Sequence, residues 1–317
     1  MSLQRLFQST PPDLAIEIGV GRISAARLTW RGATASVAAH AVEPLPPGAL
    51  VPALAAPNMP DVPTVGRAIA QAVGRMGGRA RRAALVVPDT VAKVSLLKFE
   101  QVPSRPADLM ELIRWQMRKS APFPLDTAVV TFTTGSPSPE GGHEFVVAVA
   151  RRDIIEEYES ACSHAGLHAG LIDLATFSIV NGILAGGATP AGDWLLVHTT
   201  PAYTSLAVLR GADVIFFRNR VEDSEGTLAD VVHQTAMYYE DRLKGAGFGR
   251  VLLAGGAAAP GGAELLRRSL EDRLRVGVEA VDPRGAAGLL DRIAASPELL
   301  EALAPLIGIL ARDRKAA

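Results

Sequence analysis

The chain has 317 residues, which predicts two domains at roughly 150 residues each. Lys and Arg number 32 against 33 Asp and Glu, so the formal net charge of -1 lacks the basic excess that general nucleic-acid binding needs. We therefore expect no nucleic-acid partner. The single cysteine, Cys162, excludes an intrachain disulfide scaffold and a cysteine-cluster zinc site.

Two features of the chain bear on its compartment. No apolar run reaches the ~18 residues that a membrane-spanning helix needs. The first residues, from Met1 to Arg5, lack the apolar core of a signal peptide. We expect a cytoplasmic protein without a direct membrane span.

Three runs of β-forming residues open the chain and are separated by tight turns. They predict an antiparallel meander of strands over residues 13–19, 23–30 and 33–41. A proline-rich loop then covers 43–63. A helix with apolar residues at helical spacing follows over 64–76, and a buried-type strand over 83–87.

The same order of elements recurs later in the chain. The second set of predicted elements is a meander over 194–198, 205–209 and 214–217, a helix over 227–244, a strand over 250–254, a helix over 263–274 and a strand over 276–281. Duplicated meander-and-helix units are typical of the ribonuclease-H-like, actin-type α/β fold. The alternative is a pair of unrelated α/β domains. We expect a first lobe over 1–88 plus 167–190 and a second lobe over 191–317.

An insertion over 89–166 separates the two units. Its patterns predict a strand over 91–102, a helix over 107–119, a hairpin with strands over 127–134 and 145–150, and a second helix over 153–165. This β-α-β-β-α order predicts a small α+β subdomain inserted between the two parts of the first lobe.

The insertion also carries the most specific string in the chain. Trp115 is followed, after six residues, by Pro122-Phe123-Pro124-Leu125-Asp126. This block resembles the PilM family of actin-like proteins in type IV pilus assembly. The strings at 14–19, 252–256 and 303–311 are also similar to that family, so the resemblance covers about 13–312.

The resemblance implies a fold and a role. The fold is an actin-like ATPase (ribonuclease-H-like) duplicated fold with an inserted small subdomain. The role is that of a cytoplasmic adaptor, peripheral at the inner membrane, which binds the N-terminal peptide of a PilN-like bitopic inner-membrane protein. Pilus motor or platform proteins are further candidate partners. Many members also bind ATP between the lobes.

The family's peptide groove, between the first lobe and the insertion, implies candidate partner-binding residues. Prolines on both sides of Phe123 fix the local backbone, so we expect a preformed turn there. We expect the partner to contact Arg114, Trp115, Arg118 and Phe123. The alternative is that Trp115 and Phe123 only anchor the core of the subdomain.

A nucleotide between the lobes needs glycine turns, because glycine lets backbone N–H groups approach phosphates closely. Glu17, Gly19 and Gly21 are candidates for the first phosphate turn, and Gly255 and Gly256 for the adenosine turn. The alternatives are an ordinary hairpin and a strand-to-helix turn. The second phosphate turn departs from the family's Asp-x-Gly, since 198–202 reads His-Thr-Thr-Pro-Ala.

A second departure lies between the strands at 214–220 and 250–254. One predicted helix connects them, whereas the family places a whole subdomain there, so the fourth subdomain is missing or reduced. We expect weak ATP/Mg binding or none, and we assign no catalytic residue and no metal site. An active actin-like ATPase that binds Mg-ATP is the first alternative. A relative of the cytoplasmic region of GspL from type II secretion is the second.

Overall fold

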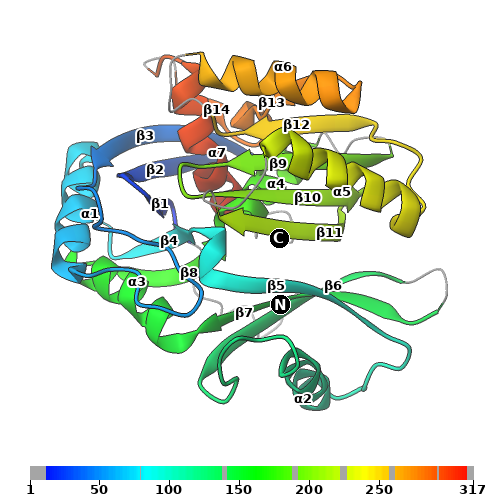
Figure 1. Cartoon of the computed structure of the whole chain (residues 1–317). Helices are drawn as coiled ribbons and strands as arrows, with labels where there is room; N and C mark the ends of the chain where they lie inside the picture. Colours follow the sequence, from blue (N-terminus) through cyan, green and yellow to red (C-terminus); the bar gives the residue numbers. More distant parts are fainter. Residues whose placement is uncertain are drawn as a thin grey trace.

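The structure is a computed structural model that describes residues 12–78, 80–137, 141–187, 192–221, 227–256, 261–290 and 293–312. Two main sheets with their helices form two lobes, and a third, smaller sheet lies beside them (Figure 1). Among the described helices, none combines the length and apolarity that crossing a membrane requires.

The first lobe is built on a sheet with the strand order β14-β3-β2-β1-β4-β8. Its strands are β1 (Leu14–Gly19), β2 (Arg22–Arg31), β3 (Thr34–Pro44), β4 (Arg82–Val87), β8 (His168–Leu174) and β14 (Gly288–Leu289). The first three strands form the predicted antiparallel meander, and β4 and β8 extend it in parallel.

Alternation along β1 determines what each face of this sheet packs against. Leu14, Ile16 and Ile18 face the helices α1 (Val62–Met76) and α3 (Arg152–His164). Ala15 faces the opposite helix, α7 (Pro297–Ala311). Because successive side chains of a strand point to opposite faces, Glu17 lies on the same face as Ala15. This places an acidic side chain on the α7 side of the sheet.

The second lobe has the strand order β11-β10-β9-β12-β13. Its strands are β9 (Asp193–Thr199), β10 (Tyr203–Arg210), β11 (Asp213–Val221), β12 (Arg250–Ala254) and β13 (Val278–Ala280). Both lobes therefore share one topology, a meander extended in parallel from its first strand, and the predicted duplication is confirmed. The helices α5 (Leu228–Leu243) and α6 (Gly262–Leu274) cover one face, and α4 (Ala175–Ala185) packs on the other.

The described residues between β11 and β12 hold a single helix, α5. Its N-terminus is fixed by a capping box, in which the Thr227 side chain accepts from the Asp230 N–H and the Asp230 side chain accepts from the Thr227 N–H. The sequence predicts that the fourth subdomain is missing or reduced at this place. The single helix α5 in the described part of the connection agrees with that prediction.

Two helices cross between the lobes, contrary to the expected lobe boundaries. α4, expected in the first lobe, packs Ile179 and Val180 against the second sheet. α7, expected in the second lobe, is buried over its last ten residues, 302–311, against the first sheet and α4. A helix that is apolar all round must be covered on all sides, and only the space between the lobes offers that.

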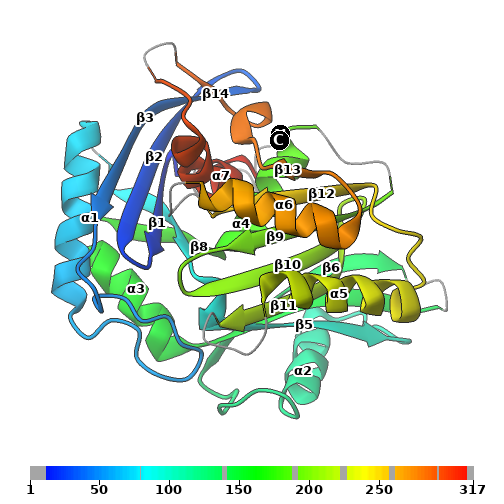
Figure 2. The ribbon, with the colours of Figure 1, turned by 45° about the horizontal axis from the view of Figure 1, so that its top comes forward.

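The inserted subdomain is a three-stranded sheet in the order β5-β7-β6. Its elements are β5 (Ala92–Phe99), α2 (Pro106–Met117), β6 (Ala128–Pro137) and β7 (His143–Arg151). Figures 1 and 2 show α2 on the face of this sheet turned away from β11 of the second lobe. The last predicted helix of the insertion, α3, instead packs on α1, because its apolar stripe with Ile154 and Tyr158 completes the first-lobe core.

Candidate functional site

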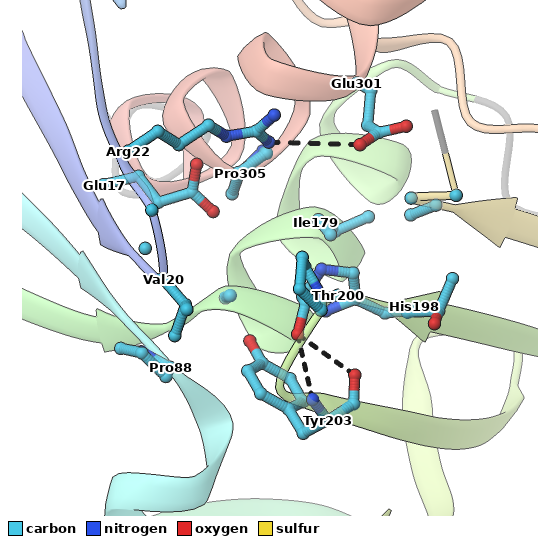
Figure 3. A pocket seen from close by; sticks show the side chains of 18 of the residues that line it. Glu17, Val20, Arg22, Pro88, Ile179, His198, Thr200, Tyr203, Glu301 and Pro305 are labelled. Carbon is cyan, nitrogen blue, oxygen red and sulfur yellow. Dashed lines mark hydrogen bonds and ion pairs between the residues drawn. The ribbon is translucent and has the colours of Figure 1, made fainter. Parts of the chain in front are cut away.

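A cavity of about 410 Å³ lies where the two lobes meet (Figure 3). Its wall is formed by the β1–β2 turn, the end of β4, the start of α4, the β9–β10 turn, the end of β12 and one side of α7. All five residues expected at a nucleotide site line it: Glu17, Gly19, Gly21, Gly255 and Gly256. The fold thus brings together residues that are up to 239 positions apart, since 256 minus 17 is 239.

Glu17 is an acidic residue that lines this cavity. Its Oε2 is shielded from solvent and has no hydrogen-bond partner among the described residues. Burial raises the pKa of Glu17 above its ordinary value, against the opposing influence of Arg22 and His198. The side chain therefore favours its neutral, protonated form more than an exposed glutamate does.

The cavity wall also carries an ion pair between β2 and α7. Arg22 of β2 approaches Glu301 of α7, with 3.9 Å between Nη2 and Oε1 (Figure 3). The one arginine thus faces two carboxyl groups, those of Glu17 and Glu301. This balance does not attract a polyanion such as a triphosphate.

The β9–β10 turn is closed by its own hydrogen bonds. The Thr200 hydroxyl accepts from the backbone N–H groups of Ala202 and Tyr203, at 3.2 and 3.1 Å. The Thr200 N–H itself donates to the Tyr203 carbonyl at 2.9 Å. Pro201 has no N–H to offer. The turn therefore leaves no N–H of residues 200–203 for a phosphate.

The β12–α6 turn explains why glycine is needed at 255. Gly255 has a φ of +94°, and a Cβ there would lie 1.8 Å from the Thr199 carbonyl oxygen. Gly256 also has a φ of +94°. The close approach of two backbones accounts for Gly255 without any ligand.

The residues present do not fit the phosphates of a nucleotide. The second turn has used its donors, and two carboxyl groups, those of Glu17 and Glu301, line the cavity. Within the described residues, no group of three or more His, Cys, Asp or Glu side chains is arranged to hold a metal ion.

The four predicted partner-binding residues divide into two pairs. Trp115 is 55% exposed on α2, and the Lys119 ammonium lies 4.4 Å from the centre of its ring. Arg118 is also exposed, with its Nη2 3.4 Å from Asp126 Oδ1. These two side chains are available to a partner.

The other pair has an internal role. Phe123 is half-buried against the core of the inserted subdomain. Arg114 donates from Nη1 to the Leu125 carbonyl at 2.7 Å, which holds the Pro-Phe-Pro turn against α2. The packing of Phe123 supports the alternative that this side chain anchors the core of the subdomain. The exposure of Trp115 does not support that alternative for Trp115.

One polar group near the cavity was missed by the sequence analysis. Asp89 follows β4 after one residue, Pro88, and is completely buried, in contact with Thr176 and Ser205. The signal available was a charged residue close after a buried-type strand, which on its own does not distinguish a buried carboxylate from an exposed turn.

Two lobes of one topology, with a cavity where they meet, define an actin-like protein. The profile of the family described as type IV pilus assembly protein PilM matches residues 15–241 of the chain. The match covers more than half of the sequence, and the chain belongs to this family.

One solved structure agrees closely in fold. A chain of the structure titled "PilM-PilN type IV pilus biogenesis complex" superposes with a TM-score of 0.81 at 19% identity, and the match covers 96% of this chain and 99% of that one. A Bacteroides thetaiotaomicron protein with an actin-like ATPase fold matches with a TM-score of 0.48 at 8% identity, over 92% and 94% of the two chains. The cytoplasmic domain of EpsL, from the Vibrio cholerae type II secretion system, matches with a TM-score of 0.45 at 9% identity, over 76% and 80%.

Proposed function

We propose that this protein is a cytoplasmic adaptor of a type IV pilus assembly platform, and that it binds the N-terminal peptide of a PilN-like bitopic inner-membrane protein. The observation that carries the proposal is membership of the PilM family over residues 15–241. A structure of similar fold is titled as a complex of PilM with PilN. In this role the protein is peripheral at the inner membrane through its partner.

The surface that we favour is the end of the inserted sheet that joins the first lobe. β5 begins there and β7 ends there, at Arg151. The Lys93 ammonium donates to the Ser120 carbonyl at 2.6 Å, which ties the segment after α2 to this end. Arg151 donates to the Ala55 carbonyl and so ties the proline-rich loop of the first lobe to the same end.

The chemistry of this surface suits a short peptide. It combines exposed apolar groups, Trp115, Pro122 and Pro124, with the exposed charges of Arg118 and Asp126. Tryptophan and arginine are the side chains most often found to dominate binding energy. A turn that is already formed lowers the entropy cost of ordering the site.

The test is fluorescence anisotropy with a labelled N-terminal peptide of a PilN-like protein from the same organism. We expect Trp115→Ala and Arg118→Ala each to weaken binding at least about tenfold. Glu100→Ala, an exposed change just after β5 at the opposite end of the inserted sheet, is the control and is expected to bind as wild type. Wild-type affinity in both test variants would show that the peptide binds elsewhere.

We further propose that the adaptor works without a nucleotide. The closed turn over residues 200–203 and the two carboxyl groups of the cavity support this. The alternative, Mg-ATP between the lobes, is favoured by the presence of all five candidate residues in one cavity. Calorimetric titration with Mg-ATP separates the two. A dissociation constant in the micromolar range or tighter, lost in Glu17→Ala and Gly256→Trp, would support the alternative.

A further inference from the structure

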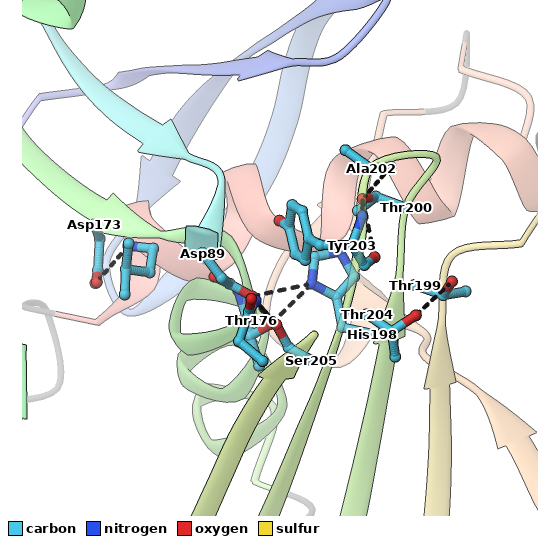
Figure 4. A network of polar contacts seen from close by, with 12 residues as sticks. Asp89, Asp173, Thr176, His198, Thr199, Thr200, Ala202, Tyr203, Thr204 and Ser205 are labelled. Carbon is cyan, nitrogen blue, oxygen red and sulfur yellow. Dashed lines mark hydrogen bonds and ion pairs between the residues drawn. The ribbon is translucent and has the colours of Figure 1, made fainter. Parts of the chain in front are cut away.

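A buried polar network connects three parts of the molecule around Asp89 (Figure 4). Asp89 is 0% exposed and lies in the 3₁₀ turn Asp89–Val91, which leads from β4 of the first lobe into the inserted sheet. Its carboxylate accepts from the Thr176 backbone N–H at 3.0 Å, from the Thr176 hydroxyl, and from the Ser205 hydroxyl at 2.6 Å. Thr176 belongs to α4 and Ser205 to β10 of the second lobe.

The contact with α4 is a helix cap supplied from a distant part of the chain. The N-cap residue of α4, Leu174, makes no side-chain capping bond. Asp89 accepts the free N–H of Thr176 in the first turn instead. The partial positive charge at a helix N-terminus favours a carboxylate in this position. Asp89 thus fixes the start of the helix that crosses between the lobes.

The contact of Asp89 with the second lobe is also made by a buried side chain, that of Ser205. Ser205 is fully buried; it donates to Asp89 and accepts from the Asn219 side-chain amide on β11 at 2.8 Å. β10 therefore meets the Asp89 turn through a polar group that is shielded from water, and Asn219 of β11 supports that group from the other side.

His198 extends the network to the cavity. The single hydroxyl proton of Thr176 is donated to Asp89, so its oxygen accepts from His198 Nδ1 at 2.8 Å. This bond places a proton on Nδ1. His198 also lines the cavity, and its Nδ1 lies 3.7 Å from Asp89 Oδ2. The network thus ends at the site where a ligand between the lobes would sit.

We propose that the Asp89 network is a latch that holds the two lobes and the inserted sheet in one arrangement. A buried carboxylate is costly unless hydrogen bonds satisfy it. Asp89 receives its donors only when α4 and β10 are both in place. Separation of the lobes removes the Ser205 hydrogen bond from this carboxylate. The latch is built from the protein's own groups, and this inference does not depend on the identity of the partner.

The test measures the distance between the lobes by pulsed electron spin resonance. Spin labels are attached to Gln71→Cys on α1 and Ser269→Cys on α6, both exposed, in a Cys162→Ala background. With no ligand present, the latch predicts one narrow distance distribution. We expect Ser205→Ala to broaden it toward longer distances, and Asp89→Asn to do so more strongly.

Ser178→Ala is the matched control, because Ser178 is a completely buried serine of the same helix α4 whose hydroxyl has no partner among the described residues. We expect this variant to keep the narrow distribution. Circular dichroism verifies that each variant is folded; should Asp89→Asn fail to fold, Ser205→Ala decides alone. An unchanged distribution in Ser205→Ala, or equal broadening in Ser178→Ala, would overturn the latch.

Discussion

At the scale of single residues, burial decides the chemistry of the side chains that titrate or react. Glu17 and Cys162 are the clearest cases, because burial raises the pKa of both. For each of the two residues, the raised pKa has a consequence that can be measured. The consequence would be absent if the side chain were exposed to solvent.

The first prediction concerns Glu17. Its folded-state pKa is raised, so the folded protein holds the proton longer than the unfolded chain, whose glutamates titrate near ~4.3. The group therefore lowers the free energy of unfolding as the pH rises above that value and through the folded pKa. We expect Glu17→Gln to raise the melting temperature at pH 7 by several degrees, with the gain vanishing near pH 4. Glu240→Gln, an exposed change on α5, is the control; no gain for Glu17→Gln at pH 7 would contradict the prediction.

The second prediction concerns the thiol. Cys162 is 0% exposed, and burial raises its pKa to about 11. Since the thiolate is the reactive form, we expect the native protein to react with maleimide at least about a hundredfold more slowly than the protein in denaturant. Ser120→Cys, at an exposed position, provides the fast reference in the native state. Rapid labelling of Cys162 under native conditions would show that α3 opens readily.

At the scale of elements, the close crossing of α4 and α7 organises the space between the lobes. A Cβ on Gly308 would lie 1.7 Å from the Ser178 carbonyl oxygen, and one on Gly182 would lie 3.2 Å from the Gly308 Cα. The two glycines let the helix backbones approach each other where both lobes contribute to the core.

The third prediction follows from this crossing. We expect Gly308→Ala to lower the free energy of unfolding by roughly 1–3 kcal/mol, because backbone atoms of α4 cannot move aside without displacing the helix. Gly74→Ala on α1 is the control: its Cβ meets nothing within 4 Å, so the helix propensity of alanine is expected to stabilise by about 0.5–1 kcal/mol. Urea unfolding measures both. A stabilising effect of Gly308→Ala would mean that the helices are not in close contact.

At the scale of the whole molecule, the arrangement of lobes bears on self-assembly. Filaments of actin-like proteins need matching surfaces at their two ends. The described part of the connection between β11 and β12 holds only α5, so one end of the second lobe is smaller than in a four-subdomain protein.

The fourth prediction is that the protein forms no ATP-dependent filaments. Electron microscopy with and without Mg-ATP checks this at equal protein concentration. Filaments that form only with ATP would contradict both this prediction and the proposal of a nucleotide-independent adaptor. Self-association that is equal with and without Mg-ATP contradicts neither the prediction nor the proposal, since head-to-tail contacts can use other faces.

Much of the fold follows from short-range patterns. Period-two alternation in β1 and helical spacing in α1 each determine an element and the side that it buries. The duplication was visible because both meanders repeat the same local patterns, and the Pro-Phe-Pro string was specific enough to indicate the family. Candidate residues at the tight turns, such as Gly21 and Gly255, were predicted for the same reason: glycine permits the positive φ that a turn requires.

By itself, the sequence determined the elements, their duplication, the glycine turns and the family. Only the tertiary structure decided which lobe α4, α7 and α3 pack against, and that Asp89 is buried. The physical reason is that these features depend on contacts between distant residues: Asp89 meets Thr176 across 87 positions and Ser205 across 116. An aspartate after a strand has one local pattern whether it faces water or a helix terminus, so its role exists only once the lobes have come together.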